Sequence, residues 1–294
     1  MIPTSSGSGP ATVREVLAAA GSVLAAAGVE DPARDARLLL GAVTGRDPWL
    51  LGVGSDRLPT AAQAREFARL VSARAARCPL AYLLGEWGFH EIVLKVDGRA
   101  LVPRPETELL VEEGLNAGGD RAFTALDVGC GGGAVALALA AASSGRVFAS
   151  DLDPGAVALA RQNAGLLGLE DRVEIRCGDL FAPWTEYAGH GFDLVLSNPP
   201  YVADDEWGQL APEIREYEPA LALRGGGDGL AVIRHLAAGV CGYLAPGGCC
   251  LIEIGSGQGP AAADLFRSLP EMAEVSVVPD LAGRDRVVRA RRRG

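Results

Sequence analysis

One short motif in this chain has the residue types needed to hold a planar amino group. Asn198, Pro199, Pro200 and Tyr201 follow an apolar run at 192–197 that indicates a buried strand. The carboxamide oxygen of the asparagine can accept one N–H of a primary amide or an exocyclic amine. The first proline carbonyl can accept the other, because the ring fixes the backbone and brings no N–H of its own. The tyrosine ring can lie on the flat face of the bound group.

The same four residues also have a purely structural interpretation. A residue before proline is pushed into extended geometry, so Asn-Pro-Pro is an ordinary way to end a strand. The motif alone leaves both interpretations open. A second motif upstream favours the binding site.

Residues 124–142 (TALDVGCGGGAVALALAAA) predict a strand, a glycine-rich turn and a helix. Glycines permit a tight turn and let a ligand approach the backbone closely. A phosphate loop is excluded because its Gly-Lys-Ser/Thr ending is absent. A dinucleotide fingerprint fits less well than an S-adenosylmethionine loop, since the spacing is GxGxG with a preceding acid. The cofactor-binding residues predicted here are Asp127, Gly129, Cys130, Gly131, Gly132 and Gly133.

Acidic residues also follow the next two predicted strands. Asp151 ends a strand about 20 residues after the loop, where a carboxylate can accept both ribose hydroxyls. Its alternative role is a helix N-cap before Pro154. Asp179 follows the next strand, where it could accept from an adenine amino group while Leu180 covers the ring; alternatively, Asp179 is only a turn residue.

With these motifs in place, the chain resembles the class I S-adenosylmethionine-dependent methyltransferases, and within them the release factor glutamine methyltransferases (the PrmC/HemK family). The Asn-Pro-Pro-Tyr motif is shared with adenine-N6 and guanine-N2 methyltransferases, so other segments make the resemblance specific. It extends from about residue 14 to the end of the chain and is carried by 79–89 (PLAYLLGEWGF), 101–108 (LVPRPETE), 217–223 (YEPALAL), 226–230 (GGDGL), 253–255 with Gln258, and 280–286 (DLAGRDR).

The resemblance implies a substrate and a partner. S-adenosyl-L-methionine would donate a methyl group, leaving S-adenosyl-L-homocysteine, to the glutamine side-chain nitrogen of the Gly-Gly-Gln motif in bacterial class I peptide chain release factors. The residues at 198–201 would be catalytic, with Asn198 also touching the cofactor. Glu106, Thr107 and Glu108 would line the pocket wall or brace the linker, with Arg104 paired to them.

Composition limits the remaining possibilities. A net charge of −10 disfavours a direct nucleic-acid partner, because such binding depends on basic contacts to phosphates. No apolar run is long enough to span a bilayer, and residues 1–10 lack the features of a secretion signal, so a cytoplasmic enzyme is expected. The six cysteines form no CxxC pair, so neither a metal site nor a disulfide framework is predicted. A monomer is the default expectation.

Alternation of strands and helices after residue 103 predicts an α/β fold. We expect a seven-stranded, mostly parallel Rossmann-like sheet with a small N-terminal helical domain and a β-hairpin linker. The expected divisions are a disordered tail at 1–10, a helical substrate-docking domain at 11–85, the linker at 86–102 and the methyltransferase domain at 103–294. The hairpin turn is predicted at Asp97-Gly98, and Trp49, Leu50 and Leu51 are predicted to pack among the helices. The predicted strands are 124–129, 146–151, 173–177, 192–198, 248–254, 274–279 and 285–290, the last two forming an antiparallel edge.

Three other functions are weighed against the release factor assignment. A nucleic-acid amine methyltransferase predicts a basic face and, for DNA, an inserted recognition domain, and the sequence shows neither. A paralogue that methylates a natural-product peptide or small-molecule amide would keep the catalytic motif and change the pocket walls. A non-enzymatic module that only binds the cofactor predicts a damaged catalytic motif, whereas residues 198–201 are intact.

Overall fold

The computed structural model describes residues 12–53 and 57–294, so the tail expected at 1–10 lies outside the described residues. The chain forms two compact units. One comprises the described residues up to Gly85 together with Ala211–Tyr217, and the other comprises Glu86–Leu210 and Glu218–Gly294.

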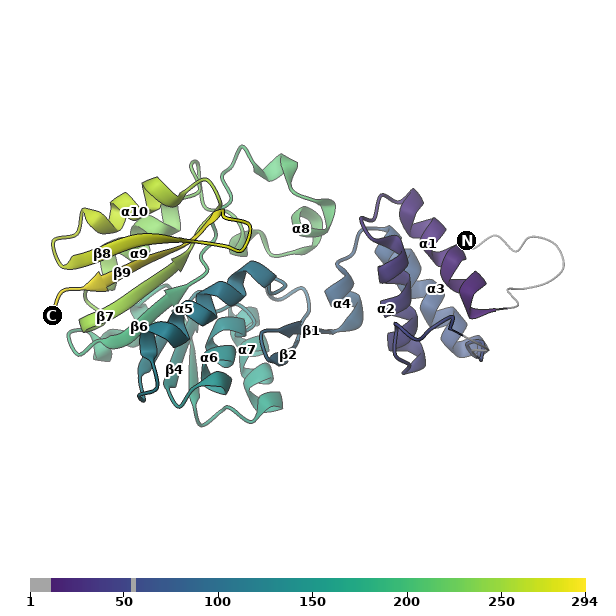
Figure 1. The fold of residues 1–294 in the computed structure, drawn as a ribbon, viewed down its shortest axis with the longest axis horizontal. Coiled ribbons are helices and arrows are strands. Elements are labelled where there is room, and N and C mark those ends of the chain that lie inside the picture. The colour runs from purple at the N-terminus through teal and green to yellow at the C-terminus, as the bar shows by residue number, and fades with distance from the viewer. Residues whose placement is uncertain (1–11, 54–56) are drawn as a thin grey trace. The chain divides into compact units, whose positions relative to one another are not determined.

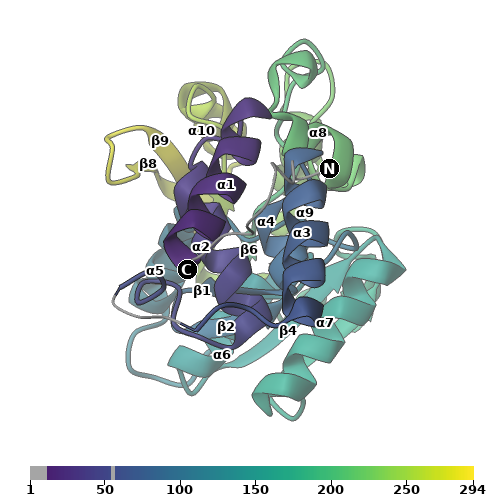
Figure 2. The same ribbon diagram turned by 90° about the vertical axis from the view of Figure 1, so that its right-hand side faces the viewer.

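The first unit is helical. Helices α1 (Val13–Ala26), α2 (Pro32–Thr44) and α3 (Ala61–Ala75) pack against one another (Figure 2), and α4 (Leu80–Leu84) packs on α2 and α3. Thr12 and Thr60 cap α1 and α3 with reciprocal capping boxes. Asp31 caps α2, whose first residue is a proline. These local signals fix where each helix begins. The apolar faces of the three helices then form the core of the unit.

The loop between α2 and α3 differs from expectation. Leu51 is buried at 2% exposure, but Trp49 and Leu50 are 61% and 63% exposed, so the prediction that they pack among the helices is wrong. The carboxylate of Asp47 accepts from the Trp49 backbone N–H at 2.8 Å and forms a tight turn. This turn directs only Leu51 inward, where its carbonyl accepts from Arg37 at 2.7 Å.

The short helix α8 (Pro212–Tyr217) belongs to the helical unit although it lies far along the chain. Arg74 donates to Asp35 at 2.7 Å and to Glu213 at 2.9 Å. Arg77 holds both oxygens of Glu213, at 2.7 and 2.6 Å. Burial alone would raise the pKa of Glu213, but the hydrogen bonds from the two arginines outweigh it and lower that pKa. The hydroxyl of Tyr217 also donates to the carbonyl of Ala76 at 2.6 Å.

The second unit contains the predicted seven-stranded sheet, in the order β5-β4-β3-β6-β7-β9-β8 (Figure 1). The first five strands in that order are parallel, and β9 and β8 form the antiparallel edge. The fold class and the antiparallel edge are therefore confirmed. The strands are β3 (Thr124–Val128), β4 (Arg146–Asp151), β5 (Val173–Cys177), β6 (Phe192–Ser197), β7 (Leu244–Glu253), β8 (Met272–Pro279) and β9 (Asp285–Arg292).

Helices cover both faces of this sheet. One face packs against α5 (Glu108–Gly118), α6 (Ala134–Ala142) and α7 (Pro154–Leu167), and the other against α9 (Ala231–Val240) and α10 (Gly259–Arg267). The neighbouring residues Cys249 and Cys250 are buried in the two different cores, as alternation along a strand requires. Four short 3₁₀ turns complete the unit: η1 (Pro105–Thr107), η2 (Ala182–Tyr187), η3 (Trp207–Gln209) and η4 (Ala220–Ala222).

The β-hairpin is present, but its turn is not where the Asp-Gly pair predicted it. Strands β1 (Glu86–Phe89) and β2 (Ile92–Lys95) are joined at His90, which has a left-handed φ of 51°. The N–H of His90 donates to the Glu108 carboxylate at 2.9 Å, a distant contact that stabilises this turn. Asp97 instead accepts from the backbone and guanidinium of Arg99, so Asp97-Gly98 forms a turn after the hairpin.

No helix in the described part of the chain is long and apolar enough to cross a membrane.

The buried arginine of the helical unit yields a stability prediction. We expect Arg74→Met to lower the free energy of unfolding by about 3–5 kcal/mol, because it leaves the buried Asp35 carboxylate without a cation. Urea denaturation followed by circular dichroism would measure the loss. The matched control is Glu66→Ala, which breaks the exposed pair with Arg69 and should change nothing measurable. Equal effects of the two substitutions would contradict the role given to the buried pair.

Candidate active site

The candidate site lies at the switch in strand order. The chain passes from β3 to β4 and β5 in one direction, and β6 then pairs with the other side of β3. At such a switch point the loops after neighbouring parallel strands diverge and leave a crevice at the carboxyl ends of the strands. The glycine-rich loop follows β3 and the Asn-Pro-Pro-Tyr motif follows β6, so both predicted motifs reach this one edge of the sheet.

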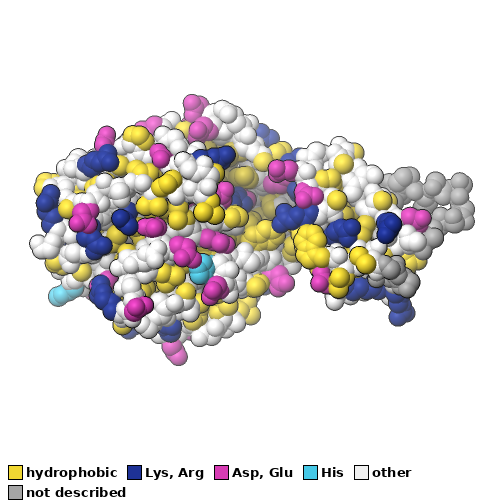
Figure 3. All heavy atoms as spheres, in the orientation of Figure 1, with side chains coloured by type: hydrophobic (Ala, Val, Ile, Leu, Met, Phe, Trp, Pro, Cys, Tyr) yellow, Lys and Arg dark blue, Asp and Glu magenta, His cyan; other side chains and the backbone are white. Residues whose placement is uncertain are grey.

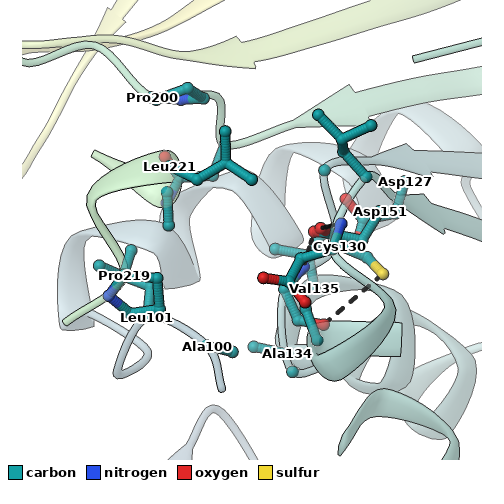
Figure 4. Close-up of a pocket in the computed structure, with 18 of the residues that line it drawn as sticks. Ala100, Leu101, Asp127, Cys130, Ala134, Val135, Asp151, Pro200, Pro219 and Leu221 are labelled. Carbon is teal, nitrogen blue, oxygen red and sulfur yellow. Dashed lines mark hydrogen bonds between the residues drawn. The ribbon is translucent and has the colours of Figure 1, made fainter. Parts of the chain in front are cut away.

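A cavity lies at this edge, and most of the predicted site residues line it (Figure 4). Three predicted residues are not among its lining, namely Gly133, Pro199 and Tyr201. The predicted residues that line it are Asp127, Gly129, Cys130, Gly131, Gly132, Asp151, Asp179, Leu180, Asn198 and Pro200.

The glycine-rich loop needs its alternate glycines for backbone reasons. Gly129, Gly131 and Gly133 have φ of 75°, 54° and 90°, values that residues with side chains rarely adopt. At Gly133 an added Cβ would lie 3.0 Å from the Leu137 side chain and 3.2 Å from Ala160. Gly133 therefore serves the packing of α6 rather than the cavity, while Gly131 faces the cavity.

Asp127 ties the end of β3 to the start of α6. It is 1% exposed, and its carboxylate accepts from the Ala136 N–H at 3.0 Å. Burial raises the pKa of Asp127 to about 7, and the nearby charge of Asp151 acts in the same direction, against the hydrogen bond from Ala136. The surroundings of Asp127 therefore disfavour the ionised form of its carboxyl. A cationic group on a bound ligand would stabilise that form.

Asp151 is held by two backbone N–H groups. One carboxylate oxygen accepts from Gly131 at 2.8 Å and the other from Asp153 at 2.9 Å. The alternative role of Asp151 as a helix cap is taken instead by Asp153, whose side chain accepts from Gly155 at the start of α7. Burial raises the pKa of Asp151, while these two hydrogen bonds lower it. Asp151 therefore links the glycine loop to the end of β4.

Leu180 occupies a conformation that a leucine rarely takes. Its φ is 45°, and its carbonyl accepts from the Ser150 hydroxyl at 3.1 Å. A non-glycine residue in the left-handed region costs about 1–2 kcal/mol and persists where the surroundings enforce it. Leu180 lines the cavity beside Asp179, so its strained backbone lies at the candidate site.

The Asn-Pro-Pro-Tyr motif is divided between the cavity and the core. Asn198 lines the cavity, and its Nδ2 donates to the Thr107 hydroxyl at 3.0 Å. Tyr201 turns away, with its hydroxyl 3.5 Å from Glu253 and its carbonyl accepting from Gln258 at 3.0 Å. Burial raises the pKa of Tyr201 to about 12. The tyrosine ring is therefore packed against the core cluster below the motif and does not line the cavity.

Of the three residues that the resemblance placed at the pocket wall, Thr107 lines the cavity, whereas Glu106 and Glu108 do not. Other residues of this wall had no role assigned from the sequence. In Figure 4, Leu101, Pro219 and Leu221 lie across the cavity from Asp127 and Asp151. Leu101, Pro219 and Leu221 lie within the stretches at 101–108 and 217–223 that carry the family resemblance. The resemblance of these stretches is therefore the sequence feature that could have predicted this wall.

Arg104 pairs with Glu218 at 2.6 Å, so the expectation that it pairs with Glu106, Thr107 or Glu108 is wrong. Glu218 is buried and also accepts from the Val102 N–H at 3.3 Å. The pair joins the two wall segments to each other. In the described ranges 12–53 and 57–294, no group of His, Cys, Asp or Glu is arranged to hold a metal ion.

Comparison with known proteins agrees with this geometry. Residues 15–85 match the family described as PrmC N-terminal domain, and residues 125–217 match a methyltransferase domain. The release factor glutamine methyltransferase of Cereibacter sphaeroides is 46% identical over 94% of this chain and 97% of its own. That of Moorella thermoacetica is 41% identical over 96% of this chain and 99% of its own. The crystal structure of a methyltransferase from Pyrococcus furiosus superposes with a TM-score of 0.50 at 18% identity, covering 68% of this chain and 88% of that chain, and shows the shared fold alone.

The fold and the cavity define a Rossmann-like methyltransferase. With relatives of this identity and coverage, the chain belongs to the release factor glutamine methyltransferase family.

The raised pKa of Asp127 predicts a pH dependence of stability. Between the unfolded pKa of about 3.9 and the folded pKa of about 7, the unfolded chain releases a proton that the folded chain keeps. The contribution of Asp127 to the free energy of unfolding therefore falls as pH rises through this window and is constant above it. We expect Asp127→Asn to lose less stability than the unsubstituted protein between about pH 5.5 and 8 in urea denaturation.

The exposed Asp120 provides the control for this experiment. Asp120→Asn should follow the unsubstituted protein at each pH. Parallel pH curves for Asp127→Asn and the unsubstituted protein would show that Asp127 is ionised normally in the folded state.

Proposed function

We propose that this protein transfers a methyl group from S-adenosyl-L-methionine to the side-chain nitrogen of the Gly-Gly-Gln glutamine in bacterial class I release factors. The observation that carries the proposal is the meeting of two motifs at one cavity. Asn198, which can hold an amide, lines the same cavity as the glycine-rich loop. Membership of the release factor glutamine methyltransferase family supports glutamine as the amide.

The cavity suits an adenosyl ligand that carries a positive charge. Asp151 and Asp179 would accept hydrogen bonds from the ribose and the adenine amino group, and Leu180 would cover the ring. Asp127 supplies a buried carboxyl near the loop. Gly131 lines the cavity, and the absence of a side chain there would allow the ligand to approach the backbone closely. When bound, S-adenosylmethionine supplies an electrophilic methyl group on its sulfonium.

The residues of the motif would prepare the weak nucleophile. An amide nitrogen shares its lone pair with the carbonyl, so it attacks poorly in its resting geometry. The Asn198 side-chain oxygen would accept one of its N–H bonds and orient the nitrogen toward the methyl donor. Pro199, whose carbonyl the sequence offered as the second acceptor, does not line the cavity. The Asn198 oxygen would also stabilise the positive charge that develops on nitrogen. Orientation alone can supply about 7–11 kcal/mol in favourable cases, and the proton can leave after transfer, so no strong base is needed.

The substrate is a protein, and the helical unit is our proposed docking domain for it. We place the reaction in the cytoplasm, with the enzyme acting as a monomer and without direct contact to nucleic acid. The net charge of −10 supports the last point. On the face of the molecule in Figure 3, basic side chains of the described residues are interspersed with acidic ones.

The direct test is mass spectrometry of a bacterial class I release factor after incubation with this protein and S-adenosylmethionine. We expect one added methyl group on the Gly-Gly-Gln glutamine, and none with Asn198→Ala. Calorimetric titration with S-adenosylhomocysteine should show that the variant still binds the cofactor product. Cofactor binding without methylation by the unsubstituted protein would refute the release factor as substrate.

The cofactor assignment predicts a specific effect of Gly131→Ala. Gly131 lines the cavity, and its φ of 54° strains any residue with a side chain, so the substitution distorts the loop that would hold the cofactor. We expect the affinity for S-adenosylhomocysteine to fall about tenfold or more, equivalent to about 1.4 kcal/mol. Gly257→Ala is the control, since Gly257 has no positive φ and open space around its Cβ position. Unchanged affinity of Gly131→Ala would place the ligand elsewhere.

A further inference from the structure

One buried polar residue behind the cavity links the hairpin linker to the glycine-rich loop. Asn163 lies on α7 and is 1% exposed. Its Oδ1 accepts from the Lys95 N–H at 2.8 Å. Its Nδ2 donates to the Lys95 carbonyl at 3.1 Å and to the Gly132 carbonyl at 2.9 Å. Lys95 is the last residue of β2, and Gly132 belongs to the glycine-rich loop, so one side chain holds two backbone segments that are far apart in the sequence.

The three contacts of Asn163 suit a carboxamide. An NH2 group has two protons, and here each goes to a different backbone carbonyl, while the oxygen accepts from one backbone N–H. These partners also establish which atom is the oxygen and which is the nitrogen, because an N–H only donates and a carbonyl only accepts. An alanine at this position would leave all three backbone groups without this partner.

An apolar contact on the same side of α7 brings the cavity wall to the same loop. Ala156, Leu159 and Asn163 are spaced three and four positions apart, so they lie on one face of the helix. Ala100 belongs with Ala156 and Leu159 to a small buried cluster, and Ala100 and Ala156 line the cavity. A Cβ added at Gly132 would lie 3.3 Å from Leu159 and 3.7 Å from Ala100, so the glycine-rich loop lies against this cluster.

The linker continues from Lys95 into the wall of the cavity. Leu101 and Pro103 line the cavity from the linker, and Gly131 and Gly132 line it from the loop. The width of the cavity between these segments therefore depends on how the linker and the loop are held relative to each other. Asn163 is hydrogen-bonded to both segments, and α7 carries it as part of the rigid core.

We propose that Asn163 is a positioning residue, which fixes the glycine-rich loop relative to the linker and so keeps the cavity at the width that an S-adenosyl ligand needs. Asn163 does not line the cavity, and it acts on the ligand through Gly132. The link works in both directions, so a ligand that orders the loop also orders the end of the hairpin. The proposal rests on the proposed function in one respect, since it takes the ligand of the cavity to be an S-adenosyl compound.

The first experiment measures the affinity for S-adenosylhomocysteine by calorimetric titration. Asn163→Ala releases the loop, which must then be ordered when the ligand binds, so the affinity should fall about tenfold or more. Gln162→Ala is the matched control, because Gln162 accepts from Arg99 of the linker at 3.1 Å and this bond does not involve the glycine-rich loop. Its affinity should equal that of the unsubstituted protein. Equal affinities for the two variants would overturn the positioning role.

A second control separates positioning from a general loss of stability. Leu236→Ala opens a cavity in the core on the other face of the sheet, where Leu236 is 1% exposed, and should lower the urea midpoint of unfolding. The titrations are made where circular dichroism shows every variant folded, and Leu236→Ala should then bind as the unsubstituted protein does. A loss of affinity as large as that of Asn163→Ala would show that the effect follows from stability alone and would overturn the proposal.

Amide hydrogen exchange tests the link without any ligand. The Lys95 N–H donates to Asn163, and the Gly133 N–H donates to the Cys130 carbonyl at 2.8 Å within the glycine-rich turn. In the ligand-free proteins both amides should exchange faster in Asn163→Ala than in Gln162→Ala, because both segments lose their anchor. Faster exchange at Lys95 alone would show that the loop keeps its order without Asn163, which would overturn the proposal.

The unsubstituted protein offers a test that needs no variant. Saturating S-adenosylhomocysteine should slow the exchange of the Lys95 amide, because ordering the loop orders the linker. The amide of Arg293, which donates to the Glu271 carbonyl at 2.8 Å beside the antiparallel edge of the sheet, should exchange at the same rate with and without the ligand. An unchanged rate at Lys95 would refute the link.

These measurements also separate the proposal from the proposed function. Binding of S-adenosylhomocysteine without methylation of a release factor would contradict the proposed function alone, and the affinities and exchange rates would still decide the role of Asn163. Failure of the unsubstituted protein to bind S-adenosylhomocysteine would overturn the ligand assignment that both proposals share.

Discussion

The site depends on the parallel pairing of β3 with β6 at the reversal of strand order. Parallel strands end at the same edge of a sheet, and helices that leave this edge on opposite faces cannot close the space between them. The loop after β3 is compact because its glycines take positive φ, and the loop after β6 is stiff because two prolines follow Asn198. The distance between the two loops is therefore set by the sheet. If the proposed function holds, a ligand on one loop and an amide on the other meet without any movement of the core.

Burial, more than net charge, controls the acidic groups around this edge. Asp127 and Glu253 are both about 1% exposed, and burial raises the pKa of each to about 7. Carboxyls in such positions reduce the stability of the fold at neutral pH, because the charged form is poorly solvated. Their hydrogen bonds go to the N–H of Ala136, at the start of α6, and to the hydroxyl of Tyr201, in the Asn-Pro-Pro-Tyr motif. The structure thus keeps costly groups at the edge of the sheet that carries the candidate site, a distribution typical of active sites.

The chain between the Asn-Pro-Pro-Tyr motif and α9 connects the two compact units. After residues 198–201 it continues to α8, which the arginines at 74 and 77 hold within the helical unit. It returns at Glu218, which pairs with Arg104 and leads directly into the cavity wall at Pro219 and Leu221. A segment with buried ion pairs thus lies a few residues from the residues that line the site. This connectivity gives the family stretch at 217–223 two structural tasks, one in each unit.

The sequence by itself determined the features that arise from neighbouring residues. Periodic apolar positions located the seven strands, and the glycine and proline motifs identified the two loops of the candidate site. These signals are local, since they depend on backbone preferences and on side chains a few positions apart. Only the tertiary structure decided which residue satisfies which distant partner: Arg104 with Glu218, Asn198 with Thr107, and His90, at the hairpin turn, with Glu108. Such pairings join residues 18 to 114 positions apart. They follow from burial and sheet register, which exist only once the whole chain has folded.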